Sequence, residues 1–195
     1  MESPIDIKIV EESKKPLSMN PKKFGMWLFL VSVVMVFASL TSAYIVRRAD
    51  GNWTHFELPA LFWLTSVIIL LSSVTMQWAY LSAKKDNQPT ARFMVTLTFV
   101  LGLAFLVGQF YGWKELVTER IFLVGNPSGS FVYIITGLHW LHIVSALIYL
   151  LIVMIAVQRK KVHPGRLLRI ELCTTYWHFL GVLWLYLFVF LLLTR

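Results

Sequence analysis

The sequence predicts an all-α integral membrane protein, a single domain in which five transmembrane helices form a bundle. Five apolar stretches without any Lys, Arg, Asp or Glu occupy most of the 195 residues, and 57% of all residues are hydrophobic. A hydrocarbon core about 30 Å thick needs about 20 helical residues at ~1.5 Å each, and every stretch reaches that length. Backbone groups in lipid must bond within their own segment, and the strand-like alternation of a barrel is absent, so we expect helices.

The five predicted spans follow a polar tail over residues 1–23 and lie at 24–46, 60–81, 93–113, 131–157 and 172–194. Prolines stand at the boundaries, where they suit the first turn of a helix: Pro21, Pro59, Pro89, Pro127 and Pro164. The polar tail has no apolar signal-peptide region. We therefore expect the first span to act as its own insertion signal.

The net charge of +8 is distributed unevenly along the chain. Of the 18 Lys and Arg, 13 fall in the tail and in the loops after the second and fourth spans. The positive-inside rule then places the N-terminus in the cytoplasm and the C-terminus outside. Because topology accounts for the charge, we expect no nucleic-acid partner.

Small residues predict where helices approach closely. The third span carries Gly102 and a GxxxG pair, Gly108 and Gly112, and the first span carries small residues at four-residue spacing, namely Ala38, Ser39, Ser42 and Ala43. In lipid, such positions favour close backbone packing.

Histidines are the most distinctive polar residues within the spans. His139 and His142 lie three residues apart and so share one helical face. One interpretation is a metal or haem site with His178 as a third ligand; the other is a neutral pair that hydrogen-bonds between helices. Cys173 is the only cysteine, which excludes internal disulfides and any site that needs two thiolates.

Other polar and aromatic residues extend this candidate network. Gln109 is close to the predicted depth of His139 and could donate to it, or could serve packing alone. Glu171 either complements the dipole at the start of the fifth helix or begins a polar strip with Tyr176 and His178. The aromatic run of the fifth span is interpreted as lipid-facing and packing surface: Tyr176, Trp177, Trp184, Tyr186 and Phe188.

These residues resemble a known family. The segment 137–142 (GLHWLH), Glu171 with the YWHF of 176–179, and the WLYLF of 184–188 are similar to the G-x-H-G-x-H, E-x4-Y-W-H-F and V-W-x-x-L/F pattern of subunit III of the haem–copper respiratory oxidases. The opening FGMWLFLVS of 24–32 and Gln109 match further parts of it. The resemblance runs from about Phe24 to the C-terminus and corresponds to the short, five-helix form.

Three positions depart from the family pattern. Val33, Gly112 and Gly181 stand where the family typically has acidic residues. An intramembrane acid often implicated in proton handling is therefore missing, which puts a proton-relay role in doubt.

The resemblance implies an accessory, non-redox subunit in a bacterial cytoplasmic (inner) membrane. Its partners would be the catalytic subunit I and subunit II, which hold the haem and copper, and membrane lipids. The resemblance does not decide whether the oxidase also joins a larger respiratory supercomplex. The subunit would stabilise the catalytic centre and retain phospholipid, with Arg159, Lys160 and Lys161 as candidate headgroup contacts. The number of possible metal ligands agrees with a non-redox role, because five histidines and one cysteine are too few for two haems and the copper sites.

Two alternatives remain open from the sequence. The nearer is subunit III of a quinol oxidase, or an accessory protein of a nitric-oxide reductase. The farther is a small membrane transporter, although such proteins usually place ionisable or unwound elements at mid-membrane.

Overall fold

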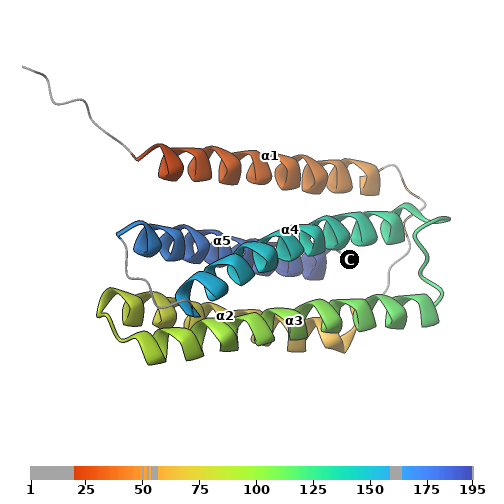
Figure 1. Ribbon diagram of the computed structural model, residues 1–195. Helices are drawn as coiled ribbons and strands as arrows, with labels where there is room; N and C mark the ends of the chain where they lie inside the picture. The colour runs from red at the N-terminus through yellow and green to blue at the C-terminus, as the bar shows by residue number, and fades with distance from the viewer. Residues whose placement is uncertain (1–19, 50, 52, 54–56, 159–163, 195) are drawn as a thin grey trace, which may run out of the picture.

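The computed structural model describes residues 20–49, 51, 53, 57–158 and 164–194, and all of its regular secondary structure is helical. The helices are α1 (Pro21–Ala49), α2 (Ala60–Lys84), α3 (Gln88–Thr118), α4 (Pro127–Gln158) and α5 (Pro164–Thr194) (Figure 1). Each of the five is long and apolar enough to cross a membrane, which confirms the predicted fold class.

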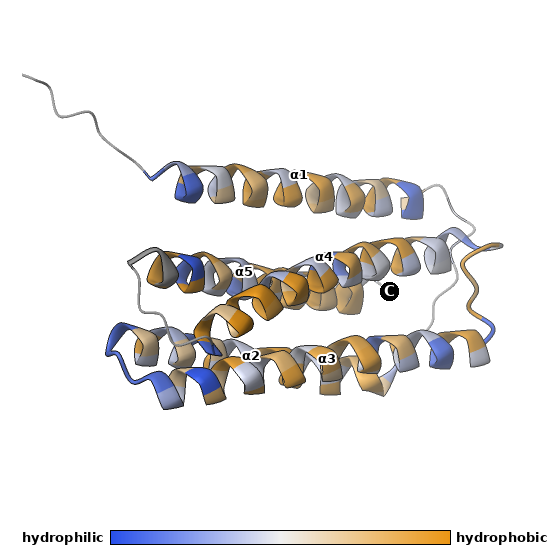
Figure 2. Cartoon of the chain, viewed as in Figure 1, coloured by the Kyte–Doolittle hydropathy of each residue, from blue (hydrophilic) through white to orange (hydrophobic). Residues whose placement is uncertain are grey.

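Each helix contains one predicted span and extends beyond it. Helix α3 has 31 residues, about 46 Å of helix, which exceeds a hydrocarbon core of about 30 Å. The additional turns carry polar and charged residues, so hydrophilic colour gathers at the two ends of the bundle (Figure 2). Proline begins α1, α4 and α5, directly precedes α2, and is the second residue of α3.

The helices form three layers (Figure 1). Helices α4 and α5 lie in the middle, with α1 on one side and the α2–α3 pair on the other; within the described residues α1 contacts only α4 and α5. Lys23 of α1 bonds Glu171 of α5 near one end, and Tyr44 of α1 bonds the Thr194 carbonyl near the other. Helices α1 and α5 therefore run parallel.

Close packing centres on α3, as its glycines predict. A Cβ atom on Gly108 would lie 2.5 Å from Thr65 Cγ2, and one on Gly112 would lie 2.5 Å from Phe62 Cε1. Both contacts are with α2, and only a hydrogen fits at these two positions. Gly102 likewise faces the Trp177 ring of α5.

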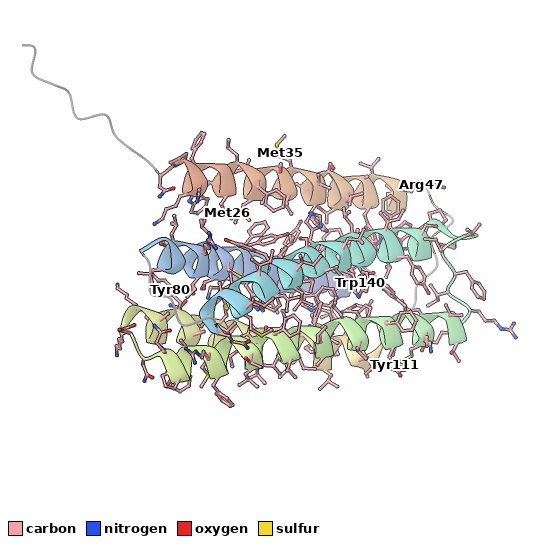
Figure 3. The ribbon with its side chains drawn as sticks, viewed as in Figure 1. Met26, Met35, Arg47, Tyr80, Tyr111 and Trp140 are labelled. Carbon is pink, nitrogen blue, oxygen red and sulfur yellow. The ribbon has the colours of Figure 1, made fainter. Side chains whose placement is uncertain are left out.

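The small residues of α1 do not pack in this way. Ala38, Ser39, Ser42 and Ala43 are all exposed, so the prediction that they form a helix contact within this chain is wrong. Three of them line a groove of about 810 Å³ beside the start of α4, and Ala38 lines a groove of about 290 Å³ beside α5. The far side of α1 is also open, and Met35 on it points away from the bundle (Figure 3).

Candidate functional site

The buried polar side chains bind one helix to another. On α5, Trp177 Nε1 donates to Ser72 Oγ at 3.0 Å, and Trp184 Nε1 donates to Ser66 Oγ at 2.9 Å. Both indoles are fully buried, and both serines belong to α2. These two bonds join α5 to α2 through neutral donors and acceptors.

The same kind of bond joins α3 to its neighbours. Gln109 Nε2 donates to Thr65 Oγ1 at 3.1 Å, and the hydroxyls of Thr75 and Thr98 lie 2.8 Å apart, so α2 and α3 are linked at two levels. Trp113 Nε1 donates to Thr136 Oγ1 of α4 at 3.0 Å. Figure 3 shows Trp140 of α4 in the region between α4 and α3, where its Nε1 donates to the Leu106 carbonyl.

His139 lies at the centre of the bundle and is fully buried. Its ring contacts Phe37 of α1, Phe105 of α3 and Trp184 of α5, with centroids 5.3–6.3 Å apart. Neither ring nitrogen has a hydrogen-bond partner among the described residues, and neither does Gln109 Oε1. Of the two alternatives for Gln109, a bond to His139 or packing alone, the bond is not formed, because the amide donates to Thr65 of α2.

His142 and Tyr176 meet on the side of the bundle that faces α1. His142 Nδ1 lies 2.8 Å from the Leu138 carbonyl of its own helix, and its ring meets the edge of Phe37. The Tyr176 hydroxyl lies 2.7 Å from Ser145 Oγ of α4. The two histidines thus share a face as predicted, but among the described residues neither imidazole makes a hydrogen bond to another helix.

His178 lies elsewhere, against α2. Its Nδ1 is 3.1 Å from Ser73 Oγ and its Nε2 is 3.1 Å from Gln77 Oε1. The imidazole of His178 thus bonds α2, that of His142 bonds its own helix, and that of His139 has no hydrogen-bond partner among the described residues. The part of the chain that the structure describes contains no group of three or more His, Cys, Asp and Glu side chains that could hold a metal ion.

Glu171 does not lie at the start of its helix, which argues against the first of its two alternatives, a carboxylate that complements the helix dipole. Helix α5 begins seven residues earlier, at Pro164, and Glu171 Oε1 pairs with Lys23 Nζ at 2.5 Å. The predicted polar strip is also wrong. Glu171 pairs with α1, Tyr176 bonds α4 and His178 bonds α2, so the three side chains have their partners on three different helices.

The aromatic run of α5 is mostly core and only partly lipid-facing. Of its five members only Tyr186 is exposed, and the buried members are Tyr176, Trp177, Trp184 and Phe188. Their bonded partners Ser66 and Ser72 were missed as site residues. The sequence signal that could have found them is the matching spacing of the two pairs. Trp177 and Trp184 are seven residues apart, and Ser66 and Ser72 are six residues apart.

The three positions that depart from the family pattern are filled by packing. Val33 is buried, Gly112 contacts the Phe62 ring, and a Cβ on Gly181 would lie 3.2 Å from Ser73 Oγ. At Gly112 a carboxylate would have to displace a fully buried phenylalanine. The candidate headgroup residues Arg159, Lys160 and Lys161 lie outside the described residues.

Comparison with known proteins identifies the family. The model of cytochrome c oxidase subunit III matches residues 10–194. The chain belongs to this family. Subunit 3 of the cytochrome c oxidase of Corynebacterium diphtheriae is 30% identical to this chain. The aligned region covers 87% of this chain and 86% of the relative. A probable subunit 3 from Nocardia farcinica is 31% identical, with 90% of this chain and 89% of the relative covered.

A third relative is named for a different oxidase. Subunit 3 of the cytochrome bo(3) ubiquinol oxidase of Buchnera aphidicola is 29% identical over 89% of this chain and 94% of its own length. The chain is therefore a subunit III of a haem–copper oxidase, a multi-pass membrane protein that associates with other oxidase subunits. Subunit III of these oxidases binds no redox cofactor itself.

Proposed function

We propose that this chain is the accessory subunit III of a proton-pumping terminal oxidase in a bacterial cytoplasmic membrane, where it stabilises the catalytic subunit and retains lipid. The observation that carries this function is the family match over residues 10–194, which includes all five helices. The haem and copper would belong to subunits I and II.

The interior of the bundle supports a structural role. The buried polar side chains of the described residues are Ser, Thr, Gln109 and His139, with no Lys, Arg, Asp or Glu among them. Most of these groups are used in bonds within or between helices, such as those of Trp177 and Trp184. Packing against a neighbour fits this chain better than proton transfer through it.

Lipid retention is supported by the grooves beside α1. The groove between α1 and α5 is lined by apolar residues such as Val34 and Val182 together with Tyr186, and suits an acyl chain. Arg159, Lys160 and Lys161 follow α4 and are proposed to meet phosphate headgroups by charge.

The orientation is proposed from the charges at the helix ends. Lys23, Lys84 and Arg169 belong to the end of the bundle where α1 and α5 start, which is the end that the positive-inside rule places in the cytoplasm. Cysteines introduced at position 22 or 195 and labelled with a membrane-impermeant thiol reagent would test it. Labelling of position 22 in intact cells would contradict the proposed orientation.

The function is tested by deleting the chain from its host and purifying the remaining oxidase. We expect intact haem spectra and normal initial oxygen consumption, followed by faster loss of activity with successive turnovers. Restoring the chain should restore the active lifetime. If its deletion abolished haem incorporation, the chain would act in assembly and the proposed stabilising role would be wrong.

A quinol oxidase is the second candidate, favoured by the similarity to the Buchnera aphidicola protein. Purification through a tag on this chain in mild detergent distinguishes the two. A partner that carries a two-cysteine copper domain and oxidises cytochrome c supports the first, and a partner that oxidises quinol supports the second. Co-purification of further respiratory complexes would show whether a supercomplex forms.

A further inference from the structure

Three polar side chains meet on the outer surface of α2 and α5. Ser73 and Gln77 of α2 both bond the imidazole of His178, as described above. With Gln77 Oε1 as the acceptor, His178 Nε2 carries the proton and Nδ1 accepts from the serine hydroxyl. The Gln77 amide NH2 then has no hydrogen-bond partner among the described residues. The Gln77 side chain is exposed, so this NH2 group is open to a neighbour outside the chain.

This cluster lies within the depth of the hydrocarbon core. Gln77 precedes Lys84 by seven residues and His178 follows Glu171 by seven, so both lie about 10 Å inside the charged residues at one end of the bundle. An amide donor without a partner is costly in hydrocarbon. Polar side chains within spans usually face a protein neighbour or a water-filled cavity.

The surroundings have the form of a helix contact. Ser73, Gln77 and His178 line a hollow of about 370 Å³ whose remaining walls are the apolar side chains Val74, Trp78 and Leu81. Val74 is 59% exposed and Trp78 is 57% exposed. An acyl chain could fill such a hollow, but it offers no acceptor to the amide.

We infer that this hollow is a docking site for a transmembrane helix of another oxidase subunit, one that presents a hydrogen-bond acceptor to the Gln77 amide. The inference rests on the proposed function, since it takes the partner from the oxidase complex. Hydrogen-bond complementarity selects a polypeptide over lipid: interhelical hydrogen bonds hold membrane helices together, and lipid tails cannot supply one.

The first test replaces the amide in the full complex. Gln77→Leu keeps the surface apolar, and we expect it to reduce retention of the haem-containing partner in detergent by about three- to tenfold. Thr96→Leu is the matched control, because Thr96 is exposed on α3 and its hydroxyl already bonds the Arg92 carbonyl of its own helix. Equal retention in both variants would overturn the inference.

The second test does not depend on the effect of a substitution on stability. A photo-crosslinking amino acid at position 74 of the tagged chain, irradiated in membranes, should form an adduct with a transmembrane peptide of another oxidase subunit. Adducts with lipid alone, or with a second copy of this chain, would overturn the docking site. If a haem protein still co-purified with the chain, the proposed function would be unaffected by that result. If no haem protein co-purified with the unmodified chain, both would be wrong.

Discussion

Helices α1 and α3 both carry small residues at four-residue spacing, and the two helices use them differently. On α3, Gly108 and Gly112 face Thr65 and Phe62 of α2, so closely that no side chain fits. On α1, the corresponding Ser39 and Ala43 are exposed and line an open groove. The same motif thus forms a tight contact in one layer and an outer surface in another.

The difference shows what a small residue needs in order to form a contact in lipid. No hydrophobic force joins helices in lipid. Close approach therefore stabilises a helix pair only where the facing helix supplies a side chain that fills the space. Helix α1 is held instead by rings and by bonds near its two ends. Phe37 contacts His139 and His142, and the Tyr44 ring packs against Phe131 and Phe190.

Bulk added at the two motifs should give the largest contrast. Gly112→Leu should destabilise the chain by about 1–3 kcal/mol, because Phe62 is fully buried and cannot move aside freely. Ala43→Leu should change stability by less than about 0.5 kcal/mol. Unfolding of the full chain in mixed detergent and SDS measures both. Similar losses in the two variants would mean that α1 packs as tightly as α3.

The next contrast concerns the hydrogen bonds that join helices. A double-mutant cycle with Trp177→Phe and Ser72→Ala should give a coupling of about 0.6–1.5 kcal/mol, since the bond is buried at 3.0 Å. A cycle with Thr41→Val and Tyr186→Phe, at 3.2 Å and partly exposed, should give less. A larger coupling for the α1 pair would reverse the ranking of the two layers.

The ion pair that links α1 to α5 should contribute still less. The side chains of Lys23 and Glu171 are 41% and 36% exposed, so Lys23→Gln should cost less than about 1 kcal/mol and the cost should shrink at high salt. The charge-swapped pair Lys23→Glu with Glu171→Lys should recover most of the loss. A loss that is independent of salt would point to packing of the lysine stem instead.

A small net effect is also expected at His139, whose ring contacts α1, α3 and α5. His139→Leu should leave stability within about 1 kcal/mol of the parent, because removal of two unpartnered buried nitrogens offsets the change in packing. His142→Leu is the comparison, since it removes a bond to the Leu138 carbonyl. A loss of several kcal/mol for His139→Leu alone would show that its nitrogens are satisfied in the membrane.

The sequence predicted the fold well and the polar network poorly. Span length and the absence of charge depend on each segment alone, so the existence and the apolar centre of each helix could be predicted, although each helix extends beyond its predicted span. The partner of Gln109 depends on which way an amide turns among several helices, and the partner of Glu171 lies 148 positions earlier in the chain. The sequence could not show which members of the aromatic run are lipid-facing and which are core, because the position of Trp177 in the chain says nothing about the serine opposite it.

The sequence by itself determined that this chain has five helices long and apolar enough to cross a membrane and that its motifs resemble subunit III of an oxidase, because hydropathy and motif spacing are properties of the linear chain. Only the tertiary structure decided which small residues contact a neighbouring helix. It also decided that His139 is buried and that His178 lies beside Gln77 on the outer surface. Those outcomes depend on the rotation of each helix about its own axis. In lipid, that rotation is set by the side chains of the facing helices.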